Sequence, residues 1–266
     1  MNMPLSDDPT LLRAAADAPA LETRGLSVSY AGVVRLRNVT VSFPRNRVTA
    51  VLGPSGCGKS TLLKALNRTL ELVPDARIDC GRAFLDATEI YSRQISPSWV
   101  RTRIGMLQQR PTPFPMSIEE NVIFGARYHG LVHDRHATVR RYLELVGLWE
   151  DVHDRLGAPA RTLSGGQQQR LCLARTLAVQ PLILLMDEPC SALDPRATAL
   201  IEQLIRELVR SYTIVVVTHN IAQARRIGDR CVFMIDGEVI AAGTREEILV
   251  DPREPAVRDF VTGRIG

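Results

Sequence analysis

Short apolar segments alternate with amphipathic segments along most of the chain. In the first third, apolar and β-branched residues gather at residues 26–30, 39–43 and 48–52, which predicts three strands. A helix is expected to begin near Gly58 and to run to about Leu70. The chain therefore starts with a β-rich part that leads directly into a helix.

Two later runs, residues 182–186 and 213–217, are continuously apolar. Such runs are typical of parallel strands, because helices cover both faces of a parallel sheet. A long helix is expected at about 195–210, between the two strands. This alternation predicts an α/β fold with chemistry at the carboxyl ends of its strands.

A charged, helix-prone stretch at about residues 128–162 precedes these strands. Its apolar positions include Val139, Leu143 and Val146, which predicts a small helical subdomain. Residues 1–20 are rich in Ala, Asp and Pro and have no sustained period. We expect them to be a flexible N-terminal extension without an assigned function.

Composition narrows the class of protein. The 266 residues are 45% hydrophobic, enough to form the core of one large domain or of one domain with a small lobe. No apolar run approaches a membrane span and no secretory signal is recognisable, so we expect a soluble, cytoplasmic protein. The formal charge of +4 and the scattered cysteines favour neither a nucleic-acid surface nor a disulfide or zinc framework.

Residues 53–61 read GPSGCGKST and match the phosphate-binding loop G-x-x-x-x-G-K-[ST] between a predicted strand and a predicted helix. Backbone N–H groups of such a loop converge on phosphate oxygens, and the positive end of the helix faces the same anion. We expect Lys59 to reach the β and γ phosphates and Ser60 to supply a ligand for Mg²⁺. The expected contacts to ATP in this loop are Gly53, Pro54, Ser55, Gly56, Cys57, Gly58, Lys59, Ser60 and Thr61. Exposure of Cys57 would make nucleotide binding sensitive to thiol reagents.

Two carboxylates, Asp187 and Glu188, end the apolar run at 182–186. We expect this strand to lie next to the strand that precedes the phosphate-binding loop. Asp187 is positioned to hold Mg²⁺, and Glu188 to orient and polarise the attacking water. Acidic residues at a helix start are the alternative explanation, but the phosphate-binding loop in the same chain favours a hydrolytic site.

The segment LSGGQQQRLCLAR at 163–175 is followed by SALD at 191–194 and by a histidine after the strand at 213–217. Here the chain resembles the ATP-binding cassette (ABC) family, whose signature is LSGGQ. The signature opens a predicted helix, so its N–H groups can hold a phosphate at a second anion site. In the family, two cassettes pair head to tail, and each ATP lies between one loop and the other chain's signature. The resemblance thus assigns ATP contacts across a homodimer interface to Ser164, Gly165, Gly166, Gln167 and Asp194.

The same resemblance implies an ABC-type P-loop NTPase fold. Its parts are an N-terminal antiparallel β subdomain, a RecA-like parallel-sheet core and a small helical subdomain. The ABC ATPase domain would span residues 21–266, with the helical subdomain inserted at about 110–175.

The family also implies roles for single side chains. Tyr30 would stack on adenine, Gln109 would approach Mg²⁺, and His219 would contact the γ phosphate. Glu188, His219 and Gln109 form the expected catalytic set. Gln108 occupies a position that is commonly aromatic in the closest relatives, so the choice between Gln108 and Gln109 stays open.

Several segments resemble the ATPase subunits of bacterial phosphate importers: PTPFPMSIEENV at 111–122, residues 162–172, DEPCSALDP at 187–195 and DFVTGRIG at 259–266. This resemblance implies an energy-coupling translocase ATPase at the cytoplasmic face of the inner membrane. Its partners would be two transmembrane permease subunits and, indirectly, a solute-binding protein, with no nucleic acid. The Pro-rich stretch after Gln109 is expected to be exposed, because the family uses this region to meet the permeases.

Three alternatives stay open. The importer could carry another solute, such as a polar amino acid. A soluble ABC ATPase acting on nucleic acid or ribosomes is less consistent with a single cassette whose two motifs are only about a hundred residues apart. A nucleotide-binding regulator without turnover is disfavoured because Glu188 supplies a base for the attacking water.

Overall fold

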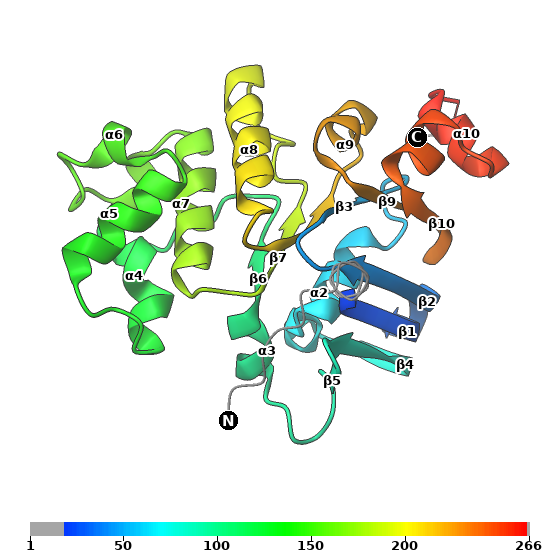
Figure 1. Ribbon diagram of the computed structural model, residues 1–266. Coiled ribbons are helices and arrows are strands. Elements are labelled where there is room, and N and C mark those ends of the chain that lie inside the picture. The colour runs from blue at the N-terminus through cyan, green and yellow to red at the C-terminus, as the bar shows by residue number, and fades with distance from the viewer. Residues whose placement is uncertain (1–18, 265–266) are drawn as a thin grey trace, which may run out of the picture.

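A computed structural model describes residues 19–264, which form two sheets and the helices around them (Figure 1). Most of the extension predicted for residues 1–20 lies outside the described residues. Pro19 and Ala20 are described, and they begin strand β1.

The first sheet is antiparallel. Its strands, in spatial order, are β2 (Val33–Pro44), β1 (Pro19–Tyr30), β4 (Ala76–Leu85) and β5 (Thr88–Glu89). The strands predicted at 26–30 and 39–43 are confirmed, although β1 and β2 are longer than the apolar runs. They extend further because β1 pairs along its length with a neighbour on each side, and this pairing includes polar residues such as Glu22.

The second sheet holds six strands and is parallel except at one edge. Its order is β10 (Glu238–Thr244), β9 (Arg230–Ile235), β3 (Val48–Leu52), β8 (Thr213–Val217), β7 (Ile183–Asp187) and β6 (Ile104–Leu107). Strands β3, β7 and β8 are buried at every residue, as their continuous apolar runs predict. Only β10 runs antiparallel to its neighbour in this sheet of the described chain.

The strand order corrects one expectation. Strand β7, which ends in the acid pair, does not lie next to β3, because β8 pairs with both of them. The other side of β3 is taken by β9. All these strands are similarly apolar and buried, so their sequences do not indicate which strands pair with each other.

Helix α2 (Lys59–Leu66) lies between the two sheets, where Leu62 and Leu66 share a hydrophobic core with residues of both. Alternate residues of β8 face the other way, toward α8 (Pro195–Leu208). The predicted end of α2 near Leu70 is wrong, because Arg68 adopts a left-handed φ of 57° and a 3-10 turn, η1 (Thr69–Leu72), follows. The remaining elements around the sheets are α3 (Pro97–Arg103), α9 (Ile221–Ile227), the π-helical turn η3 (Glu246–Val250) and α10 (Pro255–Val261).

Four helices form a separate layer, drawn in green at the left of Figure 1. They are α4 (Ile118–Tyr128), α5 (Arg135–Leu145), α6 (Trp149–Val152) and α7 (Gly165–Ala178), with a 3-10 turn η2 (Ala160–Thr162) before α7. Helix α4 packs against α5 and α7. We propose that this layer is the helical subdomain expected at about 110–175.

The Pro-rich stretch at 111–115 is exposed or half-buried at every residue, as expected, whereas the end of segment 111–122 is buried. Ser117 caps α4, and Ile118 and Asn121 are fully buried. The Asn121 side chain accepts a hydrogen bond from the Phe114 N–H at 2.7 Å and donates to the Phe114 carbonyl at 3.2 Å. The amide thus ties the Pro-rich loop to the helix that follows it. Within residues 19–264, no helix combines the length and the apolar character needed to cross a membrane.

Candidate functional site

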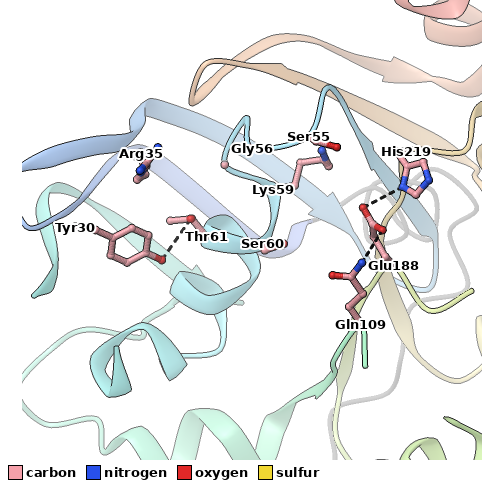
Figure 2. A pocket seen from close by; sticks show the side chains of 11 residues that line it. Tyr30, Arg35, Ser55, Gly56, Lys59, Ser60, Thr61, Gln109, Glu188 and His219 are labelled. Carbon is pink, nitrogen blue, oxygen red and sulfur yellow. Dashed lines mark hydrogen bonds and ion pairs between the residues drawn. The ribbon is translucent and has the colours of Figure 1, made fainter. Parts of the chain in front are cut away.

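A cavity of about 560 Å³ opens at the carboxyl ends of the central strands (Figure 2). Its lining comes from segments far apart in the sequence: Tyr30 from β1, Arg35 from β2, the loop after β3, and the residues that follow β6, β7 and β8. The lining residues are Tyr30, Arg35, Ser55, Gly56, Gly58, Lys59, Ser60, Thr61, Gln109, Glu188 and His219. Parallel α/β sheets bind their ligands at this edge, so the location agrees with the sequence prediction.

The phosphate-binding loop is closely packed against neighbouring backbone. Gly53 has a φ of 146°, and a Cβ there would lie 2.0 Å from the carbonyl oxygen of Met234. Gly58 has a φ of 105°, and its Cβ would lie 2.8 Å from the carbonyl oxygen of Arg35. Glycine is therefore required at both positions to let the loop curl over the start of α2.

Lys59 is the buried cation of the loop. Its Nζ donates to the carbonyl oxygens of Gly53 and Pro54, each at 2.7 Å, and the residue is 5% exposed. Lys59 and Lys64 are the two lysines among the 33 Lys and Arg residues of the chain. A lysine, unlike an arginine, offers a compact charge with three rotatable donors, which suits a site enclosed by a curled loop.

The expectation about Cys57 is wrong. The residue is only 4% exposed, and burial raises the pKa of its thiol despite the nearby Lys59 ammonium. A buried thiol with a raised pKa is a poor nucleophile. Thiol reagents are therefore not expected to reach this loop through Cys57 in the folded chain.

Ser60 and Asp187 meet although their strands are not neighbours. The Ser60 hydroxyl donates to Asp187 Oδ1 at 3.0 Å, because α2 begins beneath the loop and points its first turn at the end of β7. Asp187 is 8% exposed; burial raises its pKa, and the hydrogen bond from Ser60 opposes that shift. The Ser60 hydroxyl and the Asp187 carboxylate lie side by side, and both offer the hard oxygen ligands that Mg²⁺ prefers.

Glu188 is held between two polar side chains. Gln109 Nε2 donates to its Oε2 at 3.1 Å, and His219 Nδ1 lies 3.1 Å from its Oε1, as the dashed lines in Figure 2 show. Its φ of 45° is unusual for a residue with a side chain, and its N–H donates to the Val217 carbonyl at 2.9 Å. The turn after β7 thus directs the Glu188 carboxylate into the cavity. A strained backbone conformation, such as this positive φ, is common at functional sites.

The two neighbouring glutamines, Gln108 and Gln109, make different contacts. Gln109 lines the cavity and contacts Glu188, whereas the Gln108 main-chain carbonyl accepts a hydrogen bond from Gln169 at 3.5 Å.

A family model described as ABC transporter matches residues 36–191, which is more than half of the chain. The chain belongs to the ABC transporter family. Two curated relatives support this family assignment. "Phosphate import ATP-binding protein PstB 2" of Synechococcus sp. (strain JA-3-3Ab) is 46% identical over 252 residues, covering 92% of this chain and 95% of that protein. "Phosphate import ATP-binding protein PstB 3" of Streptococcus pneumoniae (strain ATCC BAA-334 / TIGR4) is 46% identical over 245 residues, covering 91% and 98%.

Solved structures show the same fold. CbiO1 from Clostridium perfringens, described as part of the ABC transporter complex CbiONQ, superposes with a TM-score of 0.77 at 30% identity, over 88% of this chain and 92% of that one. A bacterial Atm1-family ABC exporter with ATP bound gives 0.79 at 22% identity, over 94% of this chain and 42% of that one, and bears on the fold alone. The expected ABC-type fold, with an antiparallel sheet, a largely parallel core sheet and packed helices, is confirmed.

The ABC signature lies outside the cavity. Ser164 caps α7 by accepting from the Gln167 N–H at 3.3 Å, while Gln167 Oε1 accepts from the Ser164 N–H at 3.0 Å. The N–H groups of Gly165 and Gly166, in this part of the described chain, have no recorded acceptor. Asp194 also lies away from the cavity and caps α8 through the N–H groups of Arg196 and Ala197, both at 2.9 Å. A single ABC chain therefore brings the expected residues together in two separate groups.

Two side chains at the site were not singled out from the sequence. Gln169 is 1% exposed, and its Nε2 donates to the carbonyls of Pro189 at 3.3 Å and of Gln108 at 3.5 Å. It thereby joins the segments that carry Gln109 and Glu188, and a glutamine on the inward face of α7 was the available signal. Arg35 lines the cavity itself, and nothing in its local sequence distinguishes it from other strand arginines.

Proposed function

We propose that this chain is the ATP-hydrolysing subunit of a membrane importer for inorganic phosphate. The hydrolytic part is supported above all by one observation, the Glu188 carboxylate held by Gln109 and His219 in the cavity that Lys59 lines. The phosphate cargo is supported by the names of relatives that match over nearly the whole chain. The permeases and the solute-binding protein, rather than this chain, would contact the transported anion.

The proposed reaction uses the residues as follows. ATP phosphates enter the loop, and Lys59 exchanges its contacts to loop carbonyls for phosphate oxygens. Glu188 accepts a proton from a water molecule as the water oxygen attacks the γ phosphorus, and the bond to ADP breaks. His219, whose Nδ1 lies 3.1 Å from Glu188 Oε1, would contact the γ phosphate. These groups would act by position and charge, which is how most phosphoryl transfer is accelerated.

A magnesium ion fits this arrangement. Ser60 and Asp187 would hold it, together with Gln109, and the hydrogen bond between Ser60 and Asp187 already places two oxygen donors at one point. When bound, the ion would neutralise charge on the phosphate oxygens.

The active form is proposed to be a homodimer. The exposed start of α7 presents the N–H groups of Gly165 and Gly166 to solvent, and the cavity of the same chain does not use them. In a head-to-tail pair these groups would complete the partner's site and bind the γ phosphate at a helix N-terminus. Asp194 would then lie at the interface while still capping α8.

A shallow groove of about 220 Å³ offers a place for the permeases. It lies between α3 and β6 on one side and α4 and α7 on the other. One of its lining residues, Phe114, is five residues after Gln109 in the chain. The rings of Phe114 and Phe124 meet edge to face at 4.9 Å, and Arg175 lies 4.1 Å from the Phe114 ring. Both phenylalanines stay partly exposed, as is typical of a surface that binds a partner. We propose that cytoplasmic segments of the permeases bind here, which places the chain at the inner face of the membrane.

Replacing Phe124 with Ala is expected to weaken binding to the permeases by about tenfold or more, because exposed aromatic anchors dominate such interfaces. The ring is 40% exposed, so its loss should leave the fold intact. Co-purification of the tagged chain with permeases from detergent-solubilised membranes measures the effect. Leu72→Ala, at an exposed residue outside the groove, is the matched control. Equal recovery of permeases with Phe124→Ala and with the control would contradict this docking site.

The cargo is tested by uptake of labelled phosphate at low external phosphate in cells that lack the chain and in the same cells with it restored. We expect uptake to return with the chain and to be competed by unlabelled phosphate but not by sulfate or amino acids. Restored uptake of another solute, with phosphate uptake unchanged, would keep the ATPase and replace the cargo.

A further inference from the structure

Arg35 is a second cation in the nucleotide cavity beside Lys59, and the proposed hydrolysis does not use it. It belongs to β2 and lines the same cavity as Tyr30 and Lys59. In Figure 2, Arg35 and Tyr30 lie at one end of the cavity, whereas Glu188 and His219 lie at the other, with the phosphate-binding loop between them. The position of Arg35 is therefore that of the nucleoside, not that of the reacting phosphate.

The backbone around Arg35 is fixed against the loop. A Cβ on Gly58 would lie 2.8 Å from the Arg35 carbonyl oxygen, and one on Gly237 would lie 2.6 Å from it. The next but one residue, Arg37, donates its N–H to the Gly237 carbonyl at 2.8 Å. These contacts fix the backbone of β2 relative to the phosphate-binding loop. The Cα of Arg35 therefore has a defined position beside the cavity.

Among residues 19–264, no carboxylate pairs with the guanidinium of Arg35. Arg24 and Arg77 of the same sheet are paired, with Glu22 and Asp79, whereas Arg35 and Arg37 of β2 form no ion pair within the described residues. Within residues 19–264, no hydrogen bond or ion pair is recorded for the Arg35 side chain, although it is exposed. Its charge and its planar donors thus remain available to a molecule in the cavity.

We propose that Arg35 is a further nucleotide-binding residue, which stacks its guanidinium on the base of the nucleotide beside Tyr30. This inference rests on the proposed binding of ATP in this cavity. The Tyr30 hydroxyl donates to Thr61 Oγ1 at 3.3 Å, which orients the ring over the start of α2. Guanidinium planes stack on aromatic systems through cation–π attraction, an interaction that lysine reproduces poorly. Tyr30 and Arg35 would thus hold the base together, while Lys59 holds the phosphates.

The test compares two ligands that share phosphates but differ in the base. For Arg35→Ala we expect the Kd of ATP, measured by isothermal titration calorimetry, to rise about fivefold to thirtyfold. The Kd of inorganic tripolyphosphate, which has no base, should stay unchanged. Arg37→Ala, at an exposed arginine of the same strand that does not line the cavity, is the matched control and should bind ATP as the unaltered chain does. Arg35→Lys should recover little of the lost ATP affinity, because it restores charge without a stacking plane.

The outcomes separate this inference from the proposed function. An unaltered chain that does not bind ATP would overturn the proposed function itself. Normal ATP affinity in Arg35→Ala, with binding intact in the unaltered chain, would overturn only the role of Arg35. Equal losses for ATP and tripolyphosphate, or full recovery with Arg35→Lys, would show a contact to phosphate and overturn the contact to the base. Matching thermal unfolding midpoints for the variants establish that these differences arise in the bound state.

Discussion

Replacing Glu188 with glutamine is expected to lower ATP turnover by about two to four orders of magnitude while ATP binding is retained. The amide keeps the size of the carboxylate but cannot accept the proton of the attacking water. Because Gln109 and His219 approach the two different carboxylate oxygens, the side chain already has a defined direction into the cavity. The loss should therefore appear in kcat, with little change in the affinity for ATP.

The same variant tests the proposed dimer. If two chains close on ATP, slow hydrolysis should trap them together, and size-exclusion chromatography with Mg-ATP should show a dimer that the unaltered chain forms only transiently. Glu238→Gln, at an exposed residue of β10 away from the cavity, is the control and should behave as the unaltered chain does. A Glu188→Gln chain that binds ATP, hydrolyses it slowly and stays monomeric would contradict the head-to-tail dimer. Normal turnover would remove Glu188 from the reaction.

Replacing Lys59 with alanine is expected to weaken ATP binding by about tenfold to a hundredfold. A charge-assisted hydrogen bond contributes about 1.5–3 kcal/mol, and 1.4 kcal/mol corresponds to a factor of ten in Kd. The substitution also leaves the Gly53 and Pro54 carbonyls without their donor, which should loosen the loop in the free chain. Calorimetric titration with ATP measures the affinity, and cells that carry the variant should lose the proposed phosphate uptake.

The chain supplies a close control for this experiment. Lys64 is the other lysine, lies on the same helix α2 and is absent from the cavity lining. Lys64→Ala removes an equal charge within five residues, so any general effect of charge on anion binding should appear in both variants. Equal, small effects of the two substitutions would show that Lys59 contributes only a diffuse positive potential.

Local sequence predicted an element correctly where the residues of a single segment are enough to explain its conformation. The loop at 53–61 requires glycines for its curled backbone and a helix directly after it, and both requirements can be seen in consecutive residues. Strands β3, β7 and β8 were predictable because burial on both faces demands an unbroken apolar run. Helix α8 was predictable for a different local reason, because its apolar positions recur with the helical period and Asp194 and Pro195 mark its start.

Expectations failed where burial depends on partners from elsewhere in the chain. Cys57 looks exposed in a glycine-rich loop, yet it is buried in a core that includes Val232 and Met234 of β9, with Lys59 Nζ 3.7 Å from its sulfur. The burial of Asn121 was not predicted either, and its amide satisfies the backbone of a loop seven residues away. In both cases the side chain is buried by contacts that cannot be inferred from the sequence immediately around it.

The sequence by itself determined the family, the nucleotide loop, the acid pair and the most apolar strands, β3, β7 and β8, because each depends on residues that are adjacent or regularly spaced. The tertiary structure alone decided that β8 separates β3 from β7, that Gln109 rather than Gln108 faces Glu188, and that Arg35 enters the cavity. These features depend on which strands pair and on how the loop at Gly58 meets the backbone of β2. The packing of the whole core determines which of several equally apolar strands pair with one another. No single segment of the sequence therefore encodes the strand order.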